Sequence, residues 1–395
     1  MSKTQTASGA APWPKVRLGD VCEIIGGGTP SIHEKAYYDG GIPWATVRDM
    51  GCRVIKKTER TISRLGLENS ATNIIKGGEL IISTHVGLGK VCYLAQDTAI
   101  NQDLKGVIPT TKELSRDYLY WWFVSIADYL VSKGTGATVK GVKLDFVKQL
   151  QLLLPPLAEQ KKIVEKVEKA LKRVDALKAQ FERMEKSAAD YFKAALAETF
   201  AAVKGEKMKL GDVCETITDG DHQPPPKTDD GVPFLVISNV ADGVLDFKAT
   251  RHVPVRYYEA IDEKRKPKMG DVLLTVTGSF GIPVLVDTDR PFCFQRHIAL
   301  LRTSKMTPEF LKYLMLAPES VQYFDRVATG AAQRTVSLSS LREMKVTLPQ
   351  MQSQREVVKR LTEIKCTASR LEEAARRCIG ICGKMRKAIL AEAFQ

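Results

Sequence analysis

The sequence predicts an α+β protein in which two similar globular domains are separated by two long helices that form an antiparallel coiled coil. Three observations predict this arrangement. The chain repeats itself at an offset of about 192 to 194 residues. Apolar residues near the middle and the end of the chain recur with heptad spacing. Short apolar runs bounded by glycine, proline and aspartate fill the remainder, as is typical of short strands.

The repeat is clearest at the ends of each copy. LGDVCE at 18–23 returns at 210–215, and AALAETF at 194–200 returns as AILAEAF at 388–394. The middles differ, because residues 29–38 have no visible counterpart in 219–230. Loops carry recognition whereas regular elements carry packing, so we expect one scaffold that binds two different targets.

The repeat also sets the expected domain boundaries. We predict a first globular domain over residues 1–156, a central helical spacer over 157–204, a second globular domain over 205–349 and a C-terminal helical spacer over 350–395. Within the globular domains, helices are predicted at 115–131 with Ser115 as N-cap, and at 307–316 with Thr307 as N-cap and Pro308 first in the helix. Trp121 and Trp122 are expected in the core.

The long helices are predicted from two heptad rows in each copy. One row is Ile163, Ala170, Leu177, Met184 and Tyr191, which returns as Val357, Ile364, Leu371, Cys378 and Met385. The other is Val167, Val174, Phe181, Ala188 and Ala195, which returns as Leu361, Ala368, Ala375, Cys382 and Ile389. Both rows are expected on the seam of a coiled coil. Each helix should begin after a proline, at Pro155-Pro156 and at Pro349.

An antiparallel pair would place the globular domains at opposite ends, whereas a parallel pair would crowd them together. The seam over 163–195 is about 50 Å long at about 1.5 Å per residue. That length is between one and one and a half turns of DNA at about 34 Å per turn.

Composition limits the class of protein. The 395 residues carry a formal net charge of +13, which favours a polyanionic partner, although residues 205–349 carry 19 basic and 19 acidic side chains. No apolar run approaches a membrane span and the start lacks a signal-peptide pattern, so we expect a cytoplasmic protein without a membrane partner. The eight cysteines contain no C-x-x-C pair and are expected to be reduced thiols.

Motifs of catalysis are missing from the sequence. It contains no [DN]-P-P-[YFW] segment for amino-group methylation, no G-x-S-x-G and no complete phosphate loop, since Gly87-Leu88-Gly89-Lys90 is too short. The five histidines form no H-x-x-x-H pair. These negatives argue against a catalytic chain.

Several signatures recur in order and in duplicate. The first copy carries Trp13-Pro14, Leu18-Gly19-Asp20-Val21, Gly27-Gly28-Thr29-Pro30-Ser31, Gly41-Ile42-Pro43-Trp44, Thr135-Gly136-Ala137-Thr138 and Leu154-Pro155-Pro156-Leu157 followed by Glu159-Gln160 and Ile163-Val164. The second carries Thr329-Gly330-Ala331-Ala332, Leu348-Pro349, Met351, Gln354 and Val357-Val358, and departs at Gln350 and Ser353. Over nearly its whole length, the chain resembles a specificity subunit of type I restriction-modification systems.

The resemblance implies two target recognition domains that each read one half of a split, asymmetric site in double-stranded DNA. It implies no cofactor on this chain. Two modification subunits would use S-adenosylmethionine to methylate adenine, and restriction subunits would use ATP and Mg. The modification subunits would dock on the helices, where exposed positions expected to contact them are Lys161, Lys172, Arg355 and Arg370.

Base readout requires polar side chains that reach base edges. In the first domain the candidates are His33, Lys35, Thr46, Arg48, Thr84, His85, Asn101 and Gln102. In the second they are His222, Gln223, Ser238, Asn239, Thr277, Ser279, Gln295, Arg296 and His297. Each of these residue types also serves as a turn or capping residue.

Two other classes of function stay open at this stage. One is a coiled-coil scaffold that binds two similar proteins without DNA. The other is a nuclease whose catalytic carboxylates follow no recognised motif, which would cleave nucleic acid alone in a metal-dependent reaction.

Overall fold

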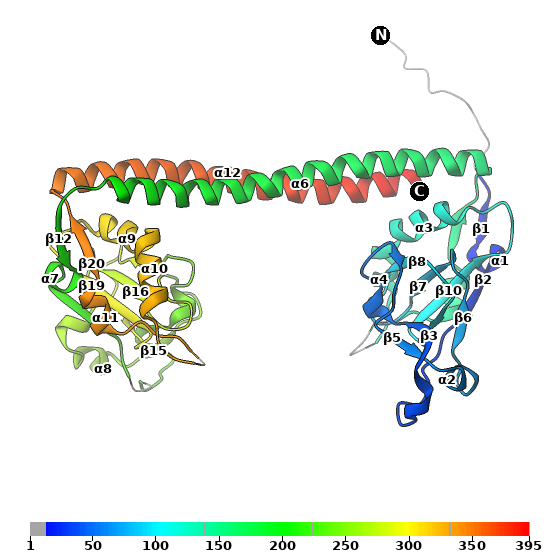
Figure 1. Ribbon diagram of the computed structural model, residues 1–395, viewed down its shortest axis with the longest axis horizontal. Coiled ribbons are helices and arrows are strands. Elements are labelled where there is room, and N and C mark those ends of the chain that lie inside the picture. The colour runs from blue at the N-terminus through cyan, green and yellow to red at the C-terminus, as the bar shows by residue number, and fades with distance from the viewer. Residues whose placement is uncertain (1–12, 137–139, 223–224, 332, 395) are drawn as a thin grey trace, which may run out of the picture. The chain divides into compact units, whose positions relative to one another are not determined.

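The computed structural model describes residues 13–136, 140–222, 225–331 and 333–394. The chain divides into two compact units, Met1–Gln180 with Cys378–Gln395, and Phe181–Arg377. Each unit contains one globular head and a part of each long helix (Figure 1). We name residues 15–153 head 1 and residues 206–348 head 2.

Head 1 contains two small sheets and a strand pair. The first sheet has the order β2 (Cys22–Gly26), β10 (Leu104–Pro109), β7 (Leu80–Ser83), β8 (Val91–Leu94) and β4 (Val54–Ile55). The second has the order β5 (Arg60–Ile62), β3 (Tyr38–Ala45), β9 (Thr98–Ile100) and β6 (Asn73–Ile75). The strand pair is β1 (Lys15–Arg17) with β11 (Gln151–Leu153), which brings the two ends of the head together.

Short helices connect these strands. They are α1 (Leu18–Val21), η1 (Lys35–Tyr37), η2 (Val47–Asp49), α2 (Arg64–Glu68), α3 (Arg116–Ser125), α4 (Ala127–Lys133) and α5 (Leu144–Lys148). The predicted helix over 115–131 is thus two helices that meet at Ile126. Trp121 and Trp122 are buried in the core, as predicted. Ser115 occupies the N-cap position but makes no side-chain capping bond.

Head 2 repeats the plan of head 1. Its sheets have the orders β13 (Thr216–Asp219), β19 (Ile298–Arg302), β16 (Val272–Thr275), β17 (Pro283–Leu285), and β15 (Arg251–Val253), β14 (Val232–Leu235), β18 (Cys293–Phe294). The closing strand pair is β12 (Glu206–Lys209) with β20 (Lys345–Leu348). The helices are α7 (Leu210–Val213), η3 (Ile237–Asn239), α8 (Val255–Glu259), η4 (Glu263–Arg265), α9 (Pro308–Leu316), α10 (Pro318–Val327) and α11 (Leu338–Glu343). The predicted helix over 307–316 is confirmed, with the Thr307 side chain capping it.

The two long helices are α6 (Leu157–Ala202) and α12 (Met351–Phe394), and each follows the predicted proline. The 46 residues of α6 contain no glycine or proline, which permits an uninterrupted helix of about 69 Å. Within the unit Phe181–Arg377, Arg360 pairs with Glu198 at 3.0 Å and Arg376 pairs with Glu185 at 2.6 Å. The partner number falls as the residue number rises, so the helices pair antiparallel, as predicted.

The two heptad rows are not equally buried. The row that contains Val167, Val174, Ala188, Ala195, Leu361, Ala368, Ala375 and Cys382 lies on the seam, with every one of these side chains at most 5% exposed. The prediction that the other row is also buried is wrong for Leu177, Tyr191, Leu371 and Met385, which are 42%, 55%, 42% and 43% exposed. Two helices cover only one narrow stripe of each other, and the chain carries a wider apolar stripe than that.

The ends of the long helices complete the cores of the heads. Leu390 and Phe394 of α12 belong to the main core of head 1, where the Phe394 ring lies 5.2 Å from the ring of Tyr118. Phe200 of α6 packs on head 2, with its ring 5.5 Å from that of Phe310. In each head, a helix residue thus packs against a core residue more than 100 positions away in the sequence.

Equivalent positions of the repeat bear a buried carboxylate in each head. Glu79 pairs with Arg116, and Asp271 receives hydrogen bonds from Arg302 at 2.6 and 2.8 Å. The guanidinium of Arg302 also donates to the carbonyl of Lys266 at 2.8 Å. The acidic position was retained while the arginine partner comes from a different element in each head.

Replacing Arg302 by methionine is expected to lower the free energy of unfolding of the head 2 unit by about 3–5 kcal/mol, because the buried Asp271 carboxylate loses its charged partner. Asp271 has a side chain only 3% exposed, so water cannot replace the guanidinium. The measurement is thermal unfolding by differential scanning calorimetry. Arg256→Met, on the exposed surface of α8, is the matched control and should leave the transition unchanged. Equal melting profiles for both variants would contradict this prediction.

Candidate nucleic-acid interface

The predicted contact residues of head 1 lie in segments that follow four strands: His33 and Lys35 come after β2, and Thr84 and His85 come after β7. Thr46 and Arg48 follow β3, and Asn101 and Gln102 follow β9. Because β3 and β9 run parallel, with Trp44 opposite Ala99, these two loops leave the sheet at the same edge. A cavity of about 250 Å³ at this edge is lined by Thr46, Arg48 and Asn101, together with Trp44 and Asp103.

The same edge of head 1 contains both buried and exposed members of the predicted set. Thr84 and Asn101 are 1% and 6% exposed, and both bond to Asp103: the Thr84 hydroxyl donates to its backbone oxygen at 3.2 Å and the Asn101 amide to its carboxylate at 3.1 Å. His85, Arg48 and Gln102 are exposed. Thr84 and Asn101 therefore shape the loops, whereas the exposed side chains can meet a ligand.

His33 and Lys35 lie on a longer loop whose base is fixed. The carbonyl of Gly28 accepts hydrogen bonds from Trp44 Nε1 at 3.3 Å and from Thr72 Oγ1 at 2.8 Å. The Tyr38 hydroxyl donates to the carbonyl of Pro30 at 2.7 Å. Both predicted side chains are exposed. Hydrogen bonds thus hold the two ends of this loop, while the side chains of His33 and Lys35 are exposed to solvent.

Head 2 places its predicted residues by the same rule. Ser238 and Asn239 follow β14, and Gln295, Arg296 and His297 follow β18, which runs parallel to β14. Thr277 and Ser279 follow β16. The structure therefore brings the two sets to the same edge of the sheet scaffold in both heads.

Two of the predicted contact residues of head 2 are buried and hydrogen-bonded inside the head. Asn239 is 7% exposed and accepts a hydrogen bond from the amide of Val236 at 3.0 Å. Thr277 is 4% exposed and accepts from the hydroxyl of Thr335 at 3.2 Å. Ser238, Ser279 and Arg296 are exposed. Burial and a nearby Arg296 lower the pKa of His297, so its imidazole is neutral near pH 7 and offers one donor and one acceptor.

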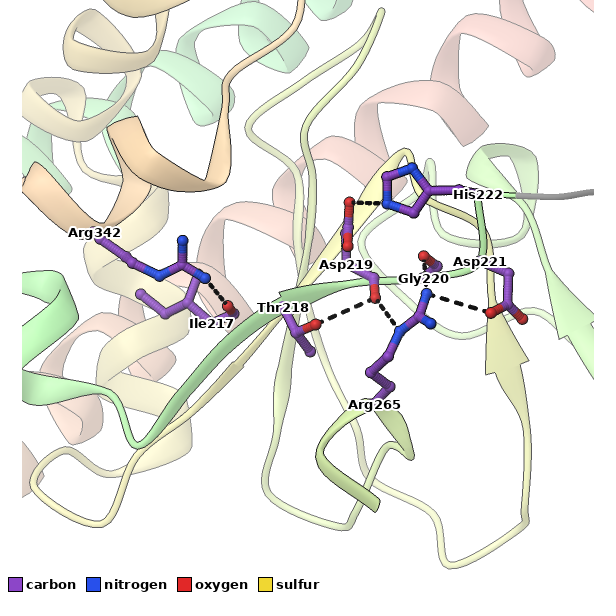
Figure 2. A network of polar contacts seen from close by, with 8 residues as sticks. All are labelled: Ile217, Thr218, Asp219, Gly220, Asp221, His222, Arg265 and Arg342. Atoms are coloured by element: carbon purple, nitrogen blue, oxygen red, sulfur yellow. Dashed lines mark hydrogen bonds and ion pairs between the residues drawn. The ribbon is translucent and has the colours of Figure 1, made fainter. Parts of the chain in front are cut away.

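The first loop of head 2 is held by an arginine that sequence reasoning missed. Figure 2 shows Arg265 donating to the carbonyls of Asp219, at 3.0 Å, and of Gly220, while its guanidinium lies 3.3 Å from the Asp221 carboxylate. The Asp219 carboxylate in turn contacts His222 Nε2 at 3.0 Å. Arg265 is the only arginine in the charged run at 263–268, but the run contains no local pattern that indicates a contact about 45 residues away.

Glycine is required at the turn of this loop. A Cβ at Gly220 would overlap the carbonyl oxygen of Phe294, and a Cβ at Gly27 would overlap that of Ile100 in head 1. The loop backbone therefore lies directly on the strand end in both heads. Gln223 lies outside the described residues, as do Ala137, Thr138 and Ala332 of the repeated signatures.

The helices present the predicted partner residues on their surface. Lys161, Lys172, Arg355 and Arg370 are all exposed. Lys161 and Arg355 each precede the exposed leucine of their own helix, Leu177 or Leu371, by 16 residues, which is about 160° around a helix of about 3.6 residues per turn. These two cations and the uncovered apolar row therefore lie on different sides of each helix.

The described residues contain no group of three or more His, Cys, Asp or Glu side chains arranged to hold a metal ion. Burial raises the pKa of Cys22, Cys92 and Cys214 to about 12, so these thiols stay protonated and unreactive near neutral pH. In the part of the chain that the structure describes, no helix is both long and apolar enough to cross a membrane.

Comparison with known proteins agrees with the repeated architecture. Residues 11–186 and 203–376 match the family model of the type I restriction modification DNA specificity domain. The specificity subunit of the type I restriction enzyme EcoBI from Escherichia coli is 22% identical over 419 residues, covering 97% of this chain and 85% of that protein. The EcoKI specificity subunit from Escherichia coli strain K12 is 24% identical over 288 residues, covering 67% of this chain and 61% of that protein.

Solved structures share the fold. A chain from a study of complex assembly and conformational transition of the type I R-M system superposes with a TM-score of 0.77 at 21% identity, covering 98% of this chain and 99% of that one. The HsdS subunit from Thermoanaerobacter tengcongensis superposes with a TM-score of 0.59 at 22% identity, covering 97% of both chains. Since the family model matches most of the chain, and matches it twice, this protein belongs to the type I restriction modification DNA specificity family.

Proposed function

We propose that this chain reads a bipartite, asymmetric sequence in double-stranded DNA as the non-catalytic specificity subunit of a type I restriction-modification complex. The observation that carries the proposal is that two heads with one strand scaffold place different polar loops at the same edge. A split target requires this: a common framework gives both heads the same approach to the duplex, and different loops read different bases.

The exposed members of the predicted set are the proposed base and phosphate contacts. In head 1 these are His33, Lys35, Arg48, His85 and Gln102. In head 2 they are His222, Ser238, Ser279 and Arg296, with the half-buried Gln295 and His297 beside them. Gln223 stays a candidate on its chemistry. Thr46, Thr84, Asn101, Asn239 and Thr277 would support the contact loops from beneath.

Two copies of one partner fit the surface of the helices. Leu177 and Met385 lie in one unit and are about 40% exposed, and their repeat equivalents Leu371 and Tyr191 lie in the other. An apolar site that occurs twice by duplication suits two identical subunits. We assign these sites to two modification subunits, which would bring S-adenosylmethionine, while restriction subunits would bring ATP and Mg²⁺.

Under this proposal the functional domains follow the boundaries expected from the repeat. Target recognition domains over residues 1–156 and 205–349 read DNA, and the helical spacers over 157–204 and 350–395 carry the partner subunits.

The direct test is a map of methylated adenines in a host genome with and without this gene. We expect methylation at one bipartite motif that disappears when the gene is deleted and returns when it is supplied again. An unchanged methylation map would remove the proposal. Metal-dependent cleavage of DNA by the purified chain alone would favour the nuclease alternative, and partner binding without any DNA binding would favour a scaffold.

Replacing Arg265 by methionine is expected to weaken recognition of the head 2 half-site about 10- to 100-fold, because the loop at Asp219–His222 loses hydrogen bonds from a charged donor. The measurement is binding by the assembled complex to duplexes with one altered half-site. Lys264→Met removes a neighbouring exposed charge and is the matched control. Equal losses at both half-sites, or equal effects of the two variants, would contradict the positioning role of Arg265.

A further inference from the structure

A glutamine in the first turn of each long helix is completely buried. Gln160 of α6 and Gln354 of α12 are both 0% exposed. A buried primary amide is costly unless its donors and acceptor are paired. In both helices the amide is paired, and every partner in these bonds is a backbone group rather than a side chain.

In head 1 the amide of Gln160 joins three backbone positions. Its oxygen accepts a hydrogen bond from the amide of Ser115 at 2.8 Å, at the start of α3. Its nitrogen donates to the carbonyls of Glu113 and Pro155, both at 2.7 Å. One side chain thus ties the start of α6 to the loop before α3 and to the turn after β11. It also gives a hydrogen-bond acceptor to the backbone amide of Ser115, the N-cap residue of α3, whose own side chain makes no capping bond.

Head 2 contains the same hydrogen-bond network around Gln354. The oxygen of Gln354 accepts from the amide of Thr307 at 2.8 Å, at the start of α9. Its nitrogen donates to the carbonyls of Lys305 and Pro349, both at 3.0 Å. The two networks match bond for bond, at equivalent positions of the repeat.

The repeat retained this glutamine while its neighbours changed. Residues 154–160 read LPPLAEQ and residues 348–354 read LPQMQSQ, so only the leucine, the first proline and the glutamine are shared. Leucine and proline direct the chain from strand into helix. Each glutamine makes one local hydrogen bond, to the proline five residues before it, while its other two reach 45 to 49 residues back into the head.

A second contact lies on the same helix face eight residues further on. Trp121 Nε1 donates to the Glu168 carboxylate at 3.1 Å, and Arg53 pairs with the same carboxylate at 2.8 Å. In head 2 the equivalent contact joins the hydroxyls of Tyr313 and Thr362 at 3.0 Å. Eight residues span about 12 Å of helix, so each head is held at two separated points and cannot pivot freely.

We propose that Gln160 and Gln354 are positioning residues that fix the angle between each head and its helix, and through it the spacing accepted between the two half-sites. This inference rests on the proposed function. One additional base pair moves a half-site by about 3.4 Å and rotates it by about 35° around the duplex. A head must be held more firmly than that to reject a spacing that is wrong by one base pair.

The test uses the complete complex of this chain with its modification subunit and a library of duplexes. Every duplex carries both cognate half-sites, separated by spacers of different length. For Gln160→Met and Gln354→Met we expect methylation at spacers one base pair too long or too short to rise about tenfold relative to the cognate spacer, the factor that one neutral hydrogen bond represents. Base preference inside each half-site should not change.

Gln352→Met is the matched control, since Gln352 lies in the same first turn of α12 but on its exposed surface. It should keep the sharp spacer profile of the unaltered complex. A profile equally sharp in Gln160→Met and Gln354→Met would overturn the proposal. A loss of base preference within a half-site would also overturn it, because that would place the glutamines in base reading.

A measurement on the unaltered protein covers the case in which the variants do not fold. The first amides of a helix lack partners inside the helix and normally exchange rapidly with solvent. Hydrogen exchange should instead show slow exchange at the amides of Ser115 and Thr307, and fast exchange there would overturn the proposal. If the unaltered complex methylates no bipartite motif at all, the proposed function fails. Slow exchange at these amides would still show that the two glutamine hydrogen bonds form.

Discussion

Exchanging residues 15–150 for the corresponding segment of another family member is expected to replace one half of the recognised DNA motif and to leave the other half unchanged. The physical reason is that each head supports its reading loops with its own strands. Head 1 anchors its loop through Trp44 and Thr72, and head 2 anchors its loop through Arg265. Neither set of anchoring bonds uses a residue of the other head. The measurement is the methylated motif in a genome that expresses the hybrid chain.

The boundary of the exchange matters for this experiment. Residue 150 precedes β11, which pairs with β1, so both strands of the closing pair must stay compatible. A matched hybrid with residues 207–344 exchanged should change the opposite half of the motif. Loss or change of both halves in either hybrid, with the complex still assembled, would sink the model of two independent readers.

Under the proposed arrangement of two modification subunits on one chain, replacing Leu177 by aspartate is expected to reduce their number from two to one, and Leu371→Asp should do the same at the other site. Both side chains are 42% exposed, so a charge there costs little in folding yet opposes an apolar contact. Burial of the exposed part of each leucine contributes about 1 kcal/mol, and an unpaired aspartate at the contact costs about 1–3 kcal/mol more, so affinity at the altered site should fall about 30-fold or more. Native mass spectrometry measures the stoichiometry directly.

The double variant Leu177→Asp with Leu371→Asp should carry no modification subunit and should methylate no DNA. Lys186→Asp, exposed on α6 and outside both heptad rows, is the control for a charge change on this helix. If both single variants keep two modification subunits, the uncovered apolar row is not their docking site. A site at Lys161, Lys172, Arg355 and Arg370 alone would then be the alternative.

The parts of the fold that depend on repetition could be predicted from the sequence. The heptads predicted the helix pair, the connectivity of the repeat predicted its antiparallel direction, and the signals at Thr307 and Pro308 predicted α9. Helix caps and apolar spacing act locally, so both can be recognised in a sequence. The exposure of Leu177 and Leu371 could not be predicted in the same way. A heptad pattern records that a row is apolar, and it does not record whether the covering partner belongs to this chain.

The structure places the predicted contact residues on loops at sheet edges, and it exposes only some of their side chains. The segments after β3, β9, β14 and β18 do meet at sheet edges, yet Thr84, Asn101, Asn239 and Thr277 are buried and hydrogen-bonded within the protein. Thr and Asn serve equally as turn formers and as contact residues, so residue type alone does not separate the two roles. Arg265 and the two glutamines act over distances of about 45 residues in sequence, which no local pattern encodes.

The core contact between Phe394 and Tyr118 has a consequence for biogenesis. The unit around head 2 is one continuous segment, Phe181–Arg377, and it can finish folding as soon as that segment has left the ribosome. The unit around head 1 is discontinuous, since Leu390 and Phe394 belong to its core. The half of the protein that is synthesised first is therefore the half whose core is completed last, when the final turn of α12 has been made.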